Sequence, residues 1–101
     1  MEGQAYIGTE LKFIVDITAS GFSMVDDDFT VTLKRGSTQH TFSKNDMVRD
    51  GEDNFYLCFD SSEFGKGIID AIVTAYVPDS DFDDGLRTEV YKFKLINILG
   101  V

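Results

Sequence analysis

The sequence GIIDAIVTAYVPDSDFDDGLRTEVYKFKLIN, residues 67–97, decides the fold of this chain. Residues 68–77 are mostly β-branched, aromatic or small and show no helical stripe, which is typical of a strand near the centre of a sheet. Pro78 ends that strand, and residues 79–85 have the composition of a turn. Residues 87–97 then alternate again, and one face of this second strand contains Glu89, Tyr91, Phe93 and Leu95. The stretch therefore predicts a long β-hairpin.

Shorter strand patterns precede the hairpin. They lie at residues 11–17, 29–34, 38–43 and 54–60. With the hairpin they make about six strands, separated by turn signals roughly every 8–12 residues and accompanied by no convincing helix. This pattern predicts an all-β, antiparallel immunoglobulin-like β-sandwich, with a small open barrel as the alternative. The expected organisation is an N-terminal arm at 1–9, a sandwich domain at 10–97 and an apolar tail at 98–101.

Length and composition agree with one domain. The chain has 101 residues, 43% of them hydrophobic, with nine Phe and four Tyr, which is enough for a single core. Its one cysteine, Cys58, cannot form an internal disulfide, so we expect a small hydrophobic residue within a strand.

The charge is strongly acidic. Nine basic and eighteen acidic residues give a net charge of −9, and the carboxylates gather at 26–28, 50–53 and 79–84, in the expected loops. Nucleic acid and anionic membranes both require a basic surface, so neither is an expected partner. The N-terminus lacks the pattern of a secretory signal, which predicts synthesis in the cytoplasm.

The acidic loop of the hairpin raises the question of a metal site, because calcium prefers oxygen ligands at alternating positions. If Asp79 held the first position of an EF-hand loop, Asp81 and Asp83 would hold the third and fifth. The sixth would be Asp84 in place of glycine and the twelfth Val90 in place of glutamate. We therefore expect a solvated acidic turn. Asp79, Asp81 and Asp83 are weak candidates for calcium, and no other cofactor is expected.

Nothing in the sequence predicts catalysis. His40 is the single histidine, and its place beside Phe42 on a strand suggests a filler or surface residue. Nucleophile elbows, phosphate loops and paired metal-binding histidines are not found. The sequence has no tryptophan for a carbohydrate platform, and no small-molecule substrate is expected.

Apolar side chains exceed what one core requires. In the strand at 68–77, Ile68, Ile72 and Tyr76 make the second face apolar as well, and the chain ends on apolar residues. The side chains expected to contact another chain are Tyr6, Ile7, Ile68, Ile72, Tyr76, Ile98, Leu99 and Val101. The alternative for the tail is that it completes the edge strand of its own domain.

Two segments carry a resemblance to a known group. FDSSEFGKG at 59–67 and AYVPDSDFDDGLRTEV at 75–90 look like small virion-associated proteins of tailed bacteriophages and prophages. More loosely, the layout of residues 10–97 resembles the immunoglobulin-like N-terminal domain of phage baseplate proteins, without the receptor-binding or fibre region that follows it there. The shared motifs form turns and carry no chemistry.

The resemblance implies a structural protein of the virion, made in the host bacterial cytoplasm. It would act as capsid decoration, neck protein, or baseplate or fibre adaptor through contacts with other virion proteins, copies of itself, or both. Its terminal arms would add to a neighbour's sheet edge. The alternative is a module that binds glycan or calcium through the acidic loops.

Overall fold

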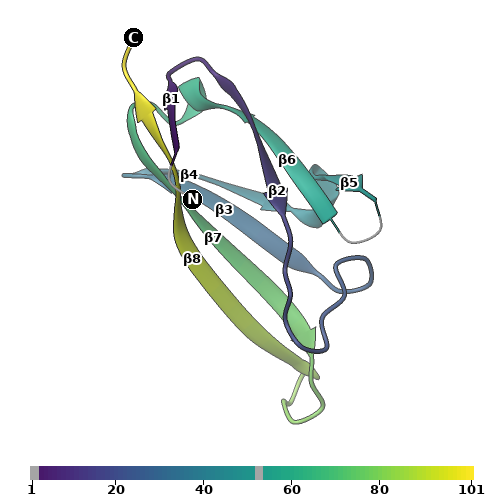
Figure 1. Ribbon diagram of the computed structural model, residues 1–101. Coiled ribbons are helices and arrows are strands. Elements are labelled where there is room, and N and C mark those ends of the chain that lie inside the picture. The colour runs from purple at the N-terminus through teal and green to yellow at the C-terminus, as the bar shows by residue number, and fades with distance from the viewer. Residues whose placement is uncertain (1–2, 52–53) are drawn as a thin grey trace.

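The long hairpin predicted from residues 67–97 is the largest element of the structure, a computed structural model that describes residues 3–51 and 54–101. Its strands are β7, Gly67–Pro78, and β8, Leu86–Leu99, which pair antiparallel (Figure 1). Residues 1–2 and 52–53 lie outside the described residues, and with them parts of the expected arm and of the acidic segment 50–53.

The larger sheet has five strands in the order β1-β8-β7-β3-β4. The strands not yet introduced are β1 (Gly3–Tyr6), β3 (Phe29–Arg35) and β4 (Thr38–Ser43). All pairings within it are antiparallel except that of β1, which runs parallel to the last residues of β8 and places Tyr6 opposite Leu99. Sequence patterns predicted β3 and β4, whereas β1 was expected as an arm.

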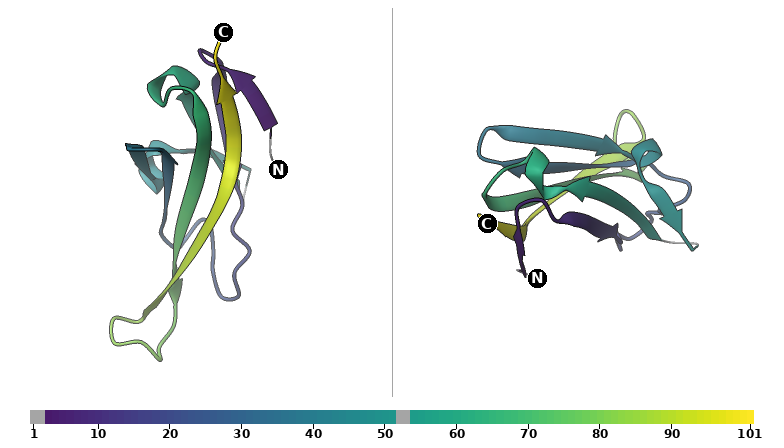
Figure 2. Two further views of the ribbon diagram at one scale, coloured as in Figure 1. Left: turned by 90° about the vertical axis from the view of Figure 1, so that its left-hand side faces the viewer. Right: turned by 90° about the horizontal axis from the view of Figure 1, so that it is seen from above.

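The smaller sheet has three strands in the order β2-β6-β5 and forms the second layer of the sandwich (Figure 2). Its strands are β2 (Glu10–Val15), β6 (Asn54–Asp60) and β5 (Val48–Asp50). The short strand β5 was not predicted. Two single turns of 3-10 helix, Lys44–Asp46 and Ser61–Glu63, complete the structure, and no helix within the described residues is long and apolar enough to cross a membrane. The all-β sandwich expected from the sequence is confirmed.

The core lies between the two sheets. Alternate side chains of β7 point into it, namely Ile69, Ala71, Val73, Ala75 and Val77. Rings from both layers meet there edge to face: Phe29 of β3 and Phe55 of β6 have centroids 5.4 Å apart. Such pairs add about 0.5–1.5 kcal/mol to the burial of their surface. The core therefore depends on contacts between the layers.

The connection before β7 relies on glycine and on one buried serine. Gly67 has φ 125°, a conformation that side chains disfavour, and a Cβ there would lie 3.4 Å from Arg35. Ser61 is fully buried, and its hydroxyl accepts a hydrogen bond of 2.9 Å from the backbone N–H of Gly8. This bond ties the turn between β1 and β2 to the turn that follows β6, at the same end of the smaller sheet.

The C-terminal residues correct the expected boundaries. Strand β8 continues to Leu99, beyond the boundary expected at residue 97. A register shift between Ile69 and Asp70 brings Ile96 opposite Ile69, so Leu95 drops out of the predicted alternation. Ile98 then stands opposite Gly67 with its side chain in the core, 1% exposed. The expectation that Ile98 would be free to contact another chain is wrong for this reason.

Candidate interaction surface

One side of the sandwich has unpaired strand edges in both layers, and we call this side the open seam. Strand β8 pairs with β1 only from Ile96 to Leu99. Along residues 86–94 its outer edge has no strand partner among the described residues, and β2 likewise pairs there with β6 alone. The longer strand extends well past β1, as Figure 2 shows. Unpaired edges of this length are uncommon in monomeric proteins because they invite pairing with another chain.

An apolar groove of about 370 Å³ lies in the open seam. Its apolar lining includes Phe13, Val15, Ile17, Val73, Tyr91 and Phe93. Tyr91 and Phe93 point toward the smaller sheet because they stand opposite Val73 and Ala71, whose side chains are buried. Phe93 reaches Phe13 of β2 with ring centroids 6.0 Å apart, and the two rings bridge the layers.

The groove is only partly covered. Tyr91 and Phe93 remain 40% and 41% exposed, although both are on the inward face of β8. The smaller sheet has three strands and the larger one has five. The part of β8 toward the tip of the hairpin is therefore not fully covered by a second layer. Burying an aromatic side chain is worth about 1.5–3 kcal/mol, and much of this stabilisation is not realised by the chain alone.

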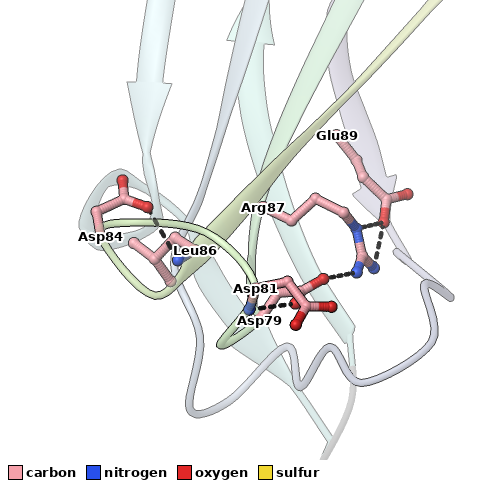
Figure 3. Close-up of polar contacts among 6 residues, drawn as sticks. All are labelled: Asp79, Asp81, Asp84, Leu86, Arg87 and Glu89. Carbon is pink, nitrogen blue, oxygen red and sulfur yellow. Dashed lines mark hydrogen bonds and ion pairs between the residues drawn. The ribbon is translucent and has the colours of Figure 1, made fainter.

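A charged network borders the groove toward the tip of the hairpin (Figure 3). Arg87 donates to Asp79 at 2.5 Å, Nη1 to Oδ2, and to Glu89 at 2.9 Å, Nη2 to Oε2. The hydroxyl of Tyr91 donates to the other carboxylate oxygen of Glu89. The inward face of β8 thus changes from ion-paired near the tip to aromatic at the groove and fully buried at Ile98.

The hydrogen bonds of this network set the titration of its members. The backbone N–H of Asp81 and, second, the Arg87 guanidinium lower the pKa of Asp79. The Tyr91 hydroxyl and, second, Arg87 lower the pKa of Glu89, whose carboxylate in turn raises the pKa of Tyr91. Both carboxylates are therefore held in their charged form.

The aspartates considered for calcium are not gathered into a site. Both oxygens of Asp79 are engaged, Oδ1 by the N–H of Asp81 at 3.0 Å and Oδ2 by Arg87. Asp81 and Asp83 have exposed side chains on the turn. Across residues 3–51 and 54–101, no three His, Cys, Asp or Glu side chains are close enough together to hold a metal ion.

Most side chains expected at an interface are accessible in this chain. Tyr6, Ile68 and Val101 are exposed, and Ile7, Ile72, Tyr76 and Leu99 are partly exposed, whereas Ile98 is buried. On the outer face of β7, Ile72 lies between Thr32 and Lys92. Polar neighbours thus separate the apolar side chains there, and the hollow of about 510 Å³ on this face, next to Ile68, is lined mainly by polar groups such as Gln4, Lys94 and Asn97.

The single histidine stands apart from the acidic residues of the hairpin. His40 is an exposed residue of β4, and its ring packs edge to face against Phe64 with centroids 5.0 Å apart. Cys58 is also exposed, on the face of β6 that points away from the core, opposite Lys12.

Sequence patterns did not identify the open seam. The alternation that puts Tyr91 and Phe93 on one face of the strand was visible in the sequence. What it could not show is that the smaller sheet stops short of this part of β8. A second row, Ile14, Tyr56 and Val48 across the outer face of the smaller sheet, was also missed, because β5 was not predicted.

No protein-family model matches the chain, and no curated protein matches it significantly. Among solved structures, it is similar to a Bacteroides vulgatus protein described as a glycoside hydrolase, with 14% identity and a TM-score of 0.45. The match covers 99% of this chain and 16% of that chain. A likeness at this level carries no argument about the function of the present chain.

Proposed function

We propose that this chain is a non-catalytic structural module that acts through protein–protein contacts in a phage particle, as capsid decoration, neck protein, or baseplate or fibre adaptor. The observation that carries the interaction role is the open seam, where an apolar groove lies between two unpaired strand edges. Assignment to a phage particle is supported only by the resemblance of residues 59–67 and 75–90 to virion proteins. The partners are other virion proteins, copies of the chain, or both.

The chemistry of the surface favours protein as the partner. A net charge of −9 opposes binding to phosphate backbones and to anionic membranes. The seam offers half-exposed aromatic rings and backbone hydrogen-bonding groups, which are the means by which sheet edges bind polypeptide. The acidic loop uses the oxygens of Asp79 internally, so glycan or calcium binding there has no support from its geometry.

Co-expression with the products of flanking genes tests the proposal. We expect at least one product to form a complex of defined stoichiometry with the chain, measured by size-exclusion chromatography with light scattering. Mass spectrometry of purified particles should then detect the chain among the virion proteins. A chain that stays monomeric with every flanking product and is absent from particles would overturn the proposal.

A calcium titration separates this proposal from the ligand-binding alternative. The carboxylates of the loop are engaged or scattered, so the melting temperature should be the same in millimolar calcium and in chelator. A rise in melting temperature that saturates with calcium would favour the alternative.

A further inference from the structure

We infer that the open seam binds an extended strand of another polypeptide, with apolar residues at alternate positions and acidic residues between them. This inference rests on the proposed interaction function and deepens it by naming the form and chemistry of the partner segment. Three features of the seam carry it: its backbone edges, its groove and the charges beside it.

The backbone of β8 requires an extended partner. Residues 86–94 form an edge about 30 Å long at about 3.3 Å per residue, and its N–H and C=O groups have no strand partner among the described residues. At the other end of the same edge, β1 pairs with Ile96–Leu99. The outer edge of β8 therefore already accepts one added strand, β1. Its unpaired part, residues 86–94, lies on the same edge and is open to a second strand.

The groove fixes what one side of the added strand must contain. A strand beside β8 places alternate side chains on the inward face, next to Tyr91 and Phe93 and across from Phe13 of β2. Apolar side chains at these positions would fill the groove of about 370 Å³ and cover both half-exposed rings. A helix laid in the groove would leave the backbone groups of β8 unpaired, so the shape favours a strand.

The other face fixes the charge of the intervening residues. Lys92 and Lys94 point outward from β8, opposite Ile72 and Asp70, and Lys92 is exposed beside an apolar neighbour. Lysine at a sheet edge discourages the addition of another strand, and an acidic residue directly opposite offsets this effect. The outward residues of the bound strand are therefore acidic at these two positions.

A second copy of the chain fits the seam less well. The outward face of its own β8 carries Lys92 and Lys94, so it would set lysines, not acidic residues, beside the lysines of the seam.

Binding of synthetic peptides to the isotopically labelled chain tests the inference by nuclear magnetic resonance. The probe is acetyl-Val-Glu-Val-Glu-Val-Thr-Val-amide, with two controls: a shuffled peptide of the same composition without alternation, and a version with lysine in place of glutamate. We expect the probe to shift the amide resonances of residues 86–94 and to slow hydrogen exchange at those amides of the segment that point away from β7. Each control peptide should bind about tenfold or more weakly.

Matched variants locate the site. Phe93→Asp should weaken binding of the probe about tenfold or more, and Phe82→Asp, at the hairpin tip and similarly exposed at 47%, should leave it unchanged. If Phe93→Asp does not give a dispersed amide spectrum, Tyr91→Ser replaces it.

Several results would overturn the inference. These are no binding at millimolar peptide, equal binding of the shuffled peptide, or shifts confined to outer-face residues such as Ile68. Sedimentation that shows a dimer abolished by Phe93→Asp would mean that a second copy fills the seam instead. If the chain still forms complexes with flanking gene products while no probe binds, the strand inference fails and the proposed function stands.

Discussion

The two ends of β8 differ in how completely the fold covers them. At the C-terminal end, β1 pairs with the edge and the core encloses Ile98. Toward the hairpin tip the same strand has an unpaired edge and half-exposed aromatic rings. Both ends belong to one continuous strand, and they differ in what lies beside them: β1 pairs with one end, and the other has no outer strand partner among the described residues. The comparison teaches that the covered end stabilises the domain, whereas the uncovered end is available to a partner.

Removing a large side chain at the covered end should have the largest effect on stability. Ile98→Ala leaves a cavity in the core, and we expect a loss of about 2–5 kcal/mol in the free energy of unfolding. Val90→Ala, on the uncovered end at 61% exposure, should change it by less than about 0.5 kcal/mol. Urea denaturation measures both. Similar losses would show that the two ends do not differ in the way described.

Removing the hydrogen bond between Ser61 and the backbone of Gly8, near the covered end, should have the next largest effect on stability. Ser61→Ala removes the acceptor of the Gly8 N–H from a fully buried site, and we expect a loss of about 1–3 kcal/mol. Hydrogen exchange at Gly8 should also become faster. Ser37→Ala, in the exposed turn between β3 and β4, is the control and should change stability little. An unchanged exchange rate at Gly8 would mean that water replaces the serine oxygen.

The covered end also shows where sequence reasoning succeeded and failed. Strong alternation and β-branched residues predicted β7, and the turn residues of 79–85 predicted the hairpin, because both are local signals. Strand β1 has only four residues and pairs with a segment more than ninety positions away, so no local pattern marks it. The register shift that buries Ile98 depends on pairing with β7 and is likewise invisible in the sequence.

The open seam was missed for a related reason. The alternation predicted that Tyr91 and Phe93 share one face of the strand, and their pairing with Val73 and Ala71 shows that this face points inward. Whether that face is covered depends on the extent of the other sheet. That extent is a tertiary feature: β2 ends at Val15, and β5 has only three residues.

At the uncovered end, the ring contact across the layers should contribute a smaller amount. Phe13 and Phe93 pack edge to face at 6.0 Å, and a double-mutant cycle with alanine should give a coupling of about 0.5–1.5 kcal/mol. The alternating peptide, if it binds the seam, should increase this coupling because it removes water from both rings. Zero coupling would show that the groove is not bridged by these rings in solution.

The charged network next to the groove should have the smallest effect on the free energy of unfolding. This effect should be seen as a dependence of stability on pH. Hydrogen bonds from Asp81 and Arg87 hold the pKa of Asp79 below its usual 3.8, and those from Tyr91 and Arg87 hold the pKa of Glu89 below 4.5. A carboxyl group with a lowered folded-state pKa adds stability that is complete above its unfolded value and is lost as pH falls through the folded value. The contribution of this network should therefore be present at neutral pH and disappear below about pH 4.

Arg87→Met isolates the part of this dependence that the guanidinium supplies. Its loss should raise the pKa of Asp79 and Glu89 toward ordinary values, so the variant should lose less stability than the parent chain between pH 7 and pH 3. Carboxyl resonances measured against pH report each group directly. Asp60 is the internal control, because its pKa is lowered by the backbone and hydroxyl of Ser62 and should not move. If Asp79 and Glu89 titrate in the variant as they do in the parent chain, Arg87 does not lower their pKa values in solution.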